Sequence, residues 1–158
     1  MKDFQDSLKS AYSLALRKLG KSAMTRKQIE IYLLKKGYMQ SNVSQVIDKL
    51  STDGYINDYE YADNAVRNVL QYNPKSKIML SHELRLKGID ELVISTAMKS
   101  FDEDRQQEMA NKLAGKHLVR YNSDSEEKIR LKISQMLYRK GFEWSVINKA
   151  LKSINSED

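Results

Sequence analysis

The sequence predicts an all-α protein, an elongated array of three tandem three-helix repeats of the helix-turn-helix type. Three observations support this prediction. Residues with high helix propensity dominate the 158-residue chain, whereas glycine occurs six times and proline once. The segments KKGY at 35–38, LKGI at 86–89 and RKGF at 139–142 each end a helix-like run at a glycine. These glycines lie 51 and 53 positions apart, so the same unit is expected to occur three times.

Apolar residues stand at fixed distances from each of the three glycines. They occupy the positions eight and four before the glycine, and one, six, nine, ten and thirteen after it. This spacing is that of two amphipathic helices joined at the glycine. The seven columns are Ile29, Leu80 and Ile133; Leu33, Leu84 and Leu137; Tyr38, Ile89 and Phe142; Val43, Ile94 and Ile147; Val46, Ala97 and Ala150; Ile47, Met98 and Leu151; Leu50, Phe101 and Ile154.

A further helix is expected before each of these pairs, marked by Ala11, Ala62 and Ala110. The three units then span 1–57, 58–103 and 104–158, with a longer loop at 121–127 in the third. Three short helices bury little apolar surface by themselves, so we expect neighbouring units to stack and share faces.

Capping residues mark several helix starts. Thr25-Arg-Lys-Gln28 and Asn57-Asp-Tyr-Glu60 both have the capping-box spacing, in which two residues satisfy each other's backbone N–H groups at the helix start. Pro74 fits the start of the next helix, where a missing N–H costs nothing. The glycine of each hairpin is predicted to adopt the left-handed conformation that ends a helix.

The composition excludes several classes of protein. The chain has no cysteine, so it has no disulfide, thiolate metal site or cysteine nucleophile. The stretch MKDFQDSLKS is not a secretory signal, and no apolar run approaches the ~20 residues that span a bilayer, so we expect a soluble cytoplasmic monomer with no membrane contact. The net charge of +6 divides into +5 for residues 1–57, −3 for 58–104 and +4 for 105–158. Basic ends around an acidic middle suit a polyanion or a mixed-charge surface as partner.

Residues suited to catalysis or metal binding are few. His82 and His117 lie in different units, and neither has a second histidine at metal-ligand spacing, so we interpret both as surface or half-buried helix residues. Asp102, Glu103 and Asp104 are interpreted as a linker and helix N-cap rather than a metal site. Because no glycine-rich phosphate loop occurs either, we expect no enzyme activity, no metal and no cofactor.

Nucleic acid remains a candidate partner because paired helices with a short turn are a DNA-binding format. The helix after Gly37 offers Gln40 and Asn42, whereas the corresponding helix of the second unit begins with Asp90 and Glu91, which repel phosphate. One unit could therefore touch DNA, but three identical readers are not supported. The single tryptophan, Trp144, stands where the sister units have polar residues; we favour packing over a partner contact for it.

One segment carries a family resemblance. The stretch LSTDGYINDYEYADNAV at 50–66 resembles the L…DGYIDDxxFA signature found between the first and second repeats of the RecX family, regulators of the bacterial RecA recombinase. The repeated KG hairpins are similar to that family's three tandem repeats, so the resemblance covers about residues 8–154. Asn57 replaces the usual first acid and Tyr61 the usual phenylalanine.

The resemblance implies a protein that binds the RecA filament on single-stranded DNA, lies along its groove and inhibits its ATPase, strand-exchange and co-protease activities, without a cofactor of its own. The competing interpretation is a helical repeat protein that binds single- or double-stranded DNA alone. We nominate as partner contacts the basic residues repeated before each glycine, although each could instead serve its own helix terminus. These are Lys35, Lys36, Arg85, Lys87, Arg139 and Lys140.

Overall fold

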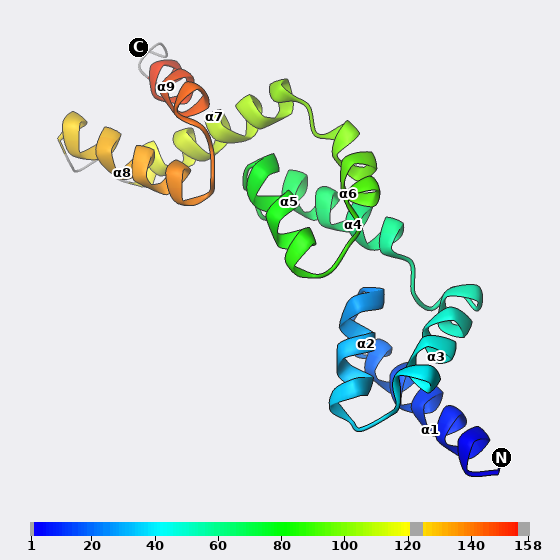
Figure 1. The fold of residues 1–158 in the computed structure, drawn as a ribbon. Helices are drawn as coiled ribbons and strands as arrows, with labels where there is room; N and C mark the ends of the chain where they lie inside the picture. The colour runs from blue at the N-terminus through cyan, green and yellow to red at the C-terminus, as the bar shows by residue number, and fades with distance from the viewer. Residues whose placement is uncertain (1, 121–124, 155–158) are drawn as a thin grey trace. The chain divides into compact units, whose positions relative to one another are not determined.

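The computed structural model describes residues 2–120 and 125–154 and is helical (Figure 1). No strand occurs in these two ranges, which confirms the predicted all-α class. None of the helices in the described part of the chain is both long and apolar enough to cross a membrane. The helices are α1 (Lys2–Leu19), α2 (Arg26–Lys35), α3 (Gln40–Thr52), α4 (Asp58–Gln71), α5 (Lys77–Leu86), α6 (Glu91–Ala97), the short 3-10 helix η1 (Met98–Ser100), α7 (Glu103–Arg120), α8 (Glu126–Arg139) and α9 (Trp144–Ser153).

Three tandem three-helix units follow one another along the chain, as predicted. Helices α1, α2 and α3 pack against one another, and so do α7, α8 and α9 (Figure 1). The repeat limits 1–57, 58–103 and 104–158 and the elongation of the array stay predictions. Of the loop expected at 121–127, residues 121–124 lie outside the described residues.

The backbone divides into two compact units that do not coincide with the repeats. One unit comprises Met1–Asp63 and Leu84–Ile94, and the other comprises Asn64–Glu83 and Ser95–Asp158. The first therefore holds the first repeat together with the α5–α6 turn, whereas the second holds the third repeat together with most of α4 and the start of α5.

The core of the first repeat comes from the expected apolar columns. Ile29 and Leu33 of α2 are fully buried, as are Val43 and Leu50 of α3. They pack with Ala11 and other residues of α1 in one hydrophobic cluster. The periodicity thus identifies the buried face of each helix, because residues three or four apart lie on one side.

The three repeated glycines end their helices in the same way. Gly37, Gly88 and Gly141 have φ values of 87°, 76° and 81°, which only glycine adopts at little cost. In each turn the N–H two residues after the C-cap reaches back to the carbonyl of the third-last helical residue, the pattern of a Schellman motif. The pairs are Tyr38 to Leu33 (3.3 Å), Ile89 to Leu84 (3.2 Å) and Phe142 to Leu137 (3.2 Å).

The capping predictions are confirmed at two starts and corrected at a third. Thr25 and Gln28 form the complete capping box, with bonds of 3.2 Å and 3.0 Å. Asp102 caps α7, since its Oδ1 accepts the N–H of Arg105 at 2.8 Å. Pro74 does not start a helix: α5 begins at Lys77. Ser76 precedes it and accepts the N–H of Met79 at 3.1 Å, because a hydroxyl can satisfy a first-turn donor and proline cannot.

Asn57 acts as an N-cap, but the structure records only one half of the expected box. Its side-chain oxygen accepts the N–H groups of Tyr59 (3.1 Å) and Glu60 (3.2 Å), whereas no return bond from the Glu60 side chain is present among the described residues. The cap alone satisfies two of the donors that a helix start leaves open.

Candidate partner-binding surface

Two of the three glycine turns are contact points between helices of different repeats. In the first compact unit, Thr25 Oγ1 donates to the carbonyl of Lys87 at 2.7 Å. In the second compact unit, the N–H of Ser76 donates to the carbonyl of Lys140 at 2.9 Å. Thr25 and Ser76 stand at the same repeat position, twelve residues before Gly37 and Gly88. Both are buried, so each bond is shielded from water.

The glycines of these two turns are also sites of close approach. A Cβ at Gly88 would meet Lys27 Cβ at 2.4 Å, and a Cβ at Gly141 would meet Ser76 Oγ at 2.6 Å. At Gly37 nothing lies within 4 Å of that position. The first turn is therefore open, whereas the other two are packed against another repeat.

This packing determines what two of the nominated basic residues do. The ammonium group of Lys140 donates to the carbonyl of Pro74 at 3.0 Å, so both its main chain and its side chain hold the third turn in place. Lys87 is half-buried and its Nζ stands over the ring of Tyr61, 5.9 Å from the centroid. Both side chains have structural partners.

Arg85 is engaged as well. Its guanidinium donates two hydrogen bonds to the Glu91 carboxylate, at 2.8 Å and 2.9 Å, across the α5–α6 turn. These bonds lower the pKa of Glu91 and raise the pKa of Arg85. Both side chains are exposed, so the pair contributes little to stability and instead fixes where the charges stand.

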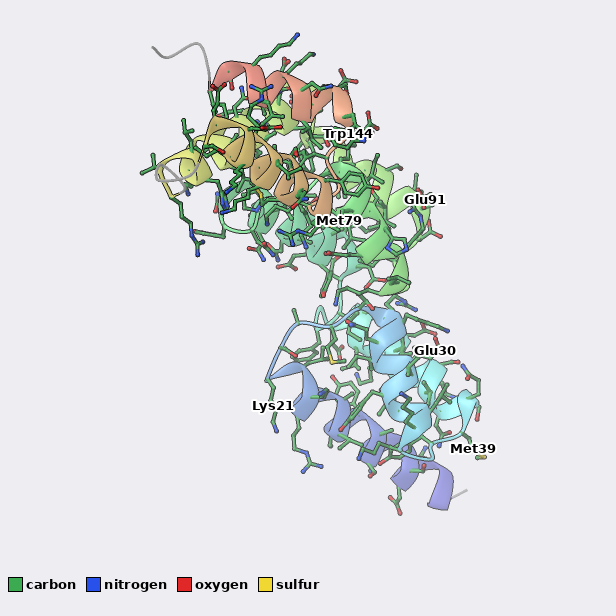
Figure 2. The ribbon with its side chains drawn as sticks, turned by 90° about the vertical axis from the view of Figure 1, so that its left-hand side faces the viewer. Lys21, Glu30, Met39, Met79, Glu91 and Trp144 are labelled. Carbon is green, nitrogen blue, oxygen red and sulfur yellow. The ribbon has the colours of Figure 1, made fainter. Side chains whose placement is uncertain are left out.

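The third repeat places aromatic rings at the two positions that Arg85 and Glu91 hold in the second. Tyr138 and Trp144 stack with their centroids 5.8 Å apart, and they remain 60% and 57% exposed. Trp144 stands at the surface of the second compact unit (Figure 2). The ring of Trp144 packs on that of Tyr138, but more than half of the residue's surface remains exposed.

The remaining nominated residues are available. Lys35 and Arg139 are exposed and have no ion pair or hydrogen bond from their side chains within the described ranges. Lys36 is exposed too, and its Nζ lies 5.9 Å from the centre of the Tyr32 ring, over which Lys18 also stands at 5.5 Å. The structure thus does not give the six residues one common role.

Sequence reasoning missed a concave surface on the second compact unit. This basic hollow has a volume of about 350 Å³, and its polar lining includes Lys112, Lys116 and His117 of α7, Lys140, and Tyr72, which directly follows α4. Burial, followed by the charges of Arg120 and Lys140, lowers the pKa of His117. The four-residue spacing of Lys112 and Lys116 was the available signal, because such residues share a helix face.

Two other hollows carry mixed charge. The one in the first compact unit has a volume of about 520 Å³; in its wall Arg26 pairs with Asp48 at 2.9 Å and its N–H donates to Asp58 at 2.9 Å. The other, in the second unit, has a volume of about 590 Å³ and includes Asp102 and Glu143 in its wall. No group of three or more His, Cys, Asp or Glu side chains suited to a metal occurs in the part of the chain that the structure describes.

Comparison with known proteins follows the repeat pattern. Three family models match the chain: the first three-helix domain of RecX at residues 11–50, the second at 57–98 and the third at 103–151. Proteins named regulatory protein RecX from Bacillus mycoides and Bacillus cytotoxicus are 32% and 33% identical over 154 residues, 98% of this chain. The chain spans 57% of the length of these relatives.

Solved structures agree with these sequence matches. The crystal structure of RecX from Lactobacillus salivarius is 30% identical, with a TM-score of 0.81 over 96% of this chain and 98% of that one. A second crystal structure of regulatory protein RecX is 31% identical, with a TM-score of 0.78 over 96% of this chain and 74% of the other. The chain belongs to the RecX family of regulatory proteins.

Proposed function

We propose that this protein binds the RecA filament on single-stranded DNA and inhibits its ATPase, strand-exchange and co-protease activities. The observation that carries the proposal is the match to all three RecX domains in order along the chain. The relatives are named regulatory proteins, and a regulator of a polymer needs surface contacts rather than a reaction centre. The expected contacts are the exposed groups that the fold itself does not use.

Those groups are chemically different in the first and third repeats. In the first, Lys18 and Lys36 share the ring of Tyr32, which concentrates positive charge beside the open turn at Gly37. In the third, the exposed residue Arg139 follows Tyr138 directly in the chain, and Tyr138 stacks on Trp144. Tryptophan, tyrosine and arginine are the residues most enriched at energetic centres of protein interfaces. We therefore place the recombinase contact of the third repeat at this stack.

The test is RecA ATPase on single-stranded DNA with this protein added far below one copy per recombinase subunit. We expect strong inhibition, because one bound copy affects many neighbouring subunits of a filament. Unchanged hydrolysis at equimolar protein would overturn the proposal.

Arg139→Glu should weaken inhibition and reduce its sensitivity to salt, because a charge contact is lost. Lys128→Glu is the matched control: it lies on the same helix, is exposed and changes the charge equally. Equal inhibition by both variants would remove Arg139 from the contact surface.

A second candidate function is DNA binding without any recombinase, and the basic hollow favours it. Titration of the protein against bare single- and double-stranded DNA separates this candidate from the first, since a pure filament regulator binds neither appreciably in the absence of RecA.

A further inference from the structure

The repeats join by one kind of contact, in which a glycine turn meets the start of a helix. The turn at Gly88 accepts a hydrogen bond from Thr25, the N-cap of α2, at 2.7 Å. The turn at Gly141 accepts one from Ser76, which directly precedes α5, at 2.9 Å. The second and third repeats thus each dock a turn on a helix start of the repeat before. Two such contacts leave over one turn, at Gly37, and one helix start, that of α8.

Both leftover surfaces are accessible. The carbonyl of Lys36 corresponds to the acceptors of the other two turns, and no N–H or O–H of the residues that the structure describes donates to it. No described residue lies within 4 Å of the place of a Cβ at Gly37. Ser125, the N-cap of α8, is exposed and its side chain makes no capping hydrogen bond. One free acceptor and one free donor therefore remain at the two leftover surfaces.

The start of α8 also extends further than the other two starts. Ser125 lies sixteen residues before the glycine of its repeat, whereas Thr25 and Ser76 lie twelve residues before theirs. Four more helical residues lengthen a helix by about 6 Å, or roughly one turn. The N-cap of α8 is therefore presented one turn beyond the length that α2 and α5 share.

The two surfaces carry opposite charge. Lys35 and Lys36 directly precede Gly37 and are exposed, and neither forms an ion pair within the described part of the chain. The first turn of α8 contains Glu126 and Glu127, whereas the first turns of α2 and α5 contain no acidic residue. The acids thus stand only at the start that no turn of the same chain covers, and they complement the lysines of the uncovered turn.

We propose that the Gly37 turn of one copy docks on the α8 start of a second copy, so that copies of this chain associate head to tail. The carbonyl of Lys36 then accepts a hydrogen bond from Ser125, and Lys35 and Lys36 face Glu126 and Glu127. Another protein could also offer a helix start to the turn. A second copy is favoured because it presents a start with a free donor and with the matching charge.

The geometry of the contact determines how the copies assemble. Its two surfaces differ, so each pair of copies still has one free turn and one free start, and an open chain can grow. One helix start on one turn is small beside the about 1,200 Å² or more of stable interfaces, so we expect single copies in dilute solution and association on concentration. The inference stands apart from the proposed function, since the contact involves no recombinase.

The test is sedimentation equilibrium of the intact protein without recombinase, at concentrations rising to about 1 mM. The average mass should rise with concentration and fall again with added salt, because charge pairs contribute to the contact. Lys35→Glu combined with Lys36→Glu should weaken association about three- to thirtyfold, and so should Glu126→Lys combined with Glu127→Lys. A mass that stays that of one chain at every concentration overturns the inference.

A charge exchange separates the contact from a local effect of the acids on their own helix. The chain with all four substitutions has the two signs exchanged and should regain the association, and so should an equal mixture of the two double variants. A purely local role of the acids at the helix start predicts no recovery in either case. Absence of recovery, with helices intact by circular dichroism, would therefore refute the contact.

The matched control is Lys99→Glu combined with Lys149→Glu, which makes the charge change of the turn variant at exposed positions away from both surfaces. We expect it to keep the association, and equal loss would show that association follows net charge alone.

Because the chain has no cysteine, Lys36→Cys and Glu127→Cys each introduce a single thiol. A short bismaleimide should link a mixture of these two variants mainly into mixed pairs. A predominance of like pairs would mean a symmetric contact and would overturn the head-to-tail arrangement.

Discussion

Replacing the repeated glycines by alanine should have unequal effects, although all three have nearly the same backbone conformation. At Gly37 the only cost is the left-handed φ, about 1–2 kcal/mol, partly offset by the about 0.4–1 kcal/mol that alanine gains through the unfolded chain. Gly37→Ala should therefore lower the free energy of unfolding by about 1 kcal/mol.

At Gly141 a second cost is added. The new methyl group would stand 2.6 Å from Ser76 Oγ and 3.0 Å from Met79 Cβ, in a turn whose carbonyl accepts the N–H of Ser76. Inserting a methyl group into such packing costs about 1–3 kcal/mol. Gly141→Ala should thus destabilise the protein by about 2–4 kcal/mol, and Gly88→Ala, which meets Lys27, by a similar amount.

Urea unfolding followed by circular dichroism measures the totals, and amide hydrogen exchange measures the local effect. The Ser76 amide should lose protection in Gly141→Ala but keep it in Gly37→Ala. In a Ser76→Ala background the cost of Gly141→Ala should shrink, since the nearest atom is gone. If all three glycine variants lose the same stability within about 0.5 kcal/mol, the packing of the second and third turns contributes nothing and the reasoning fails.

Three further predictions concern other parts of the chain. Thr25→Val should cost about 1–3 kcal/mol in urea unfolding, since it removes an N-cap and the hydrogen bond to the carbonyl of the half-buried Lys87. Thr52→Val, at an exposed helix hydroxyl, should cost less than about 0.5 kcal/mol, and equal costs would contradict this. Tyr12 donates to Asp53 at 2.6 Å, which raises the pKa of Tyr12 to about 12 and lowers the pKa of Asp53. Because the pKa of Asp53 is lower in the folded protein than in the unfolded chain, the ionised carboxylate stabilises the fold above the unfolded pKa, and this stability is lost as pH falls through the folded pKa. Tyr12→Phe should therefore reduce this loss and raise the pKa of Asp53 in a carboxyl NMR titration. An unchanged Asp53 pKa would refute the role of the bond. Trp144, the only tryptophan, should be strongly quenched by acrylamide and protected when the RecA filament binds, whereas unchanged quenching would place the contact elsewhere.

The repeat architecture was predictable because it depends on local rules. Periodic apolar residues define helix faces, and a glycine after a basic residue defines where a helix ends. Even the capping box at Thr25 lies within four residues of sequence. Such features need no knowledge of what lies opposite them.

The roles of the basic residues were not predictable for the opposite reason. The partner of Lys140 is Pro74, 66 positions away, and the partner of the Lys87 carbonyl is Thr25, 62 positions away. Both contacts arise only when one repeat meets the next, and no local pattern records which basic residue of a pair faces that junction. The basic hollow likewise combines Tyr72 and Lys140 with α7, so its lysines look like ordinary solvated residues in the sequence.

The repeats keep one scaffold but differ in chemistry at the positions that the scaffold leaves free. Three residues before and after the glycine, the second repeat has the ion pair Arg85–Glu91, and the third has the stack Tyr138–Trp144. Because these side chains are exposed, neither pair is needed for the core, and each can change without unfolding the repeat. The Arg85–Glu91 ion pair neutralises its own charges and therefore offers little to an anionic partner. The exposed Tyr138–Trp144 stack and the unpaired Arg139 remain available to such a partner. It follows that the proposed filament recognition should depend more on the third repeat than on the second, in contrast to the equal contributions that the repeated basic residues alone suggest.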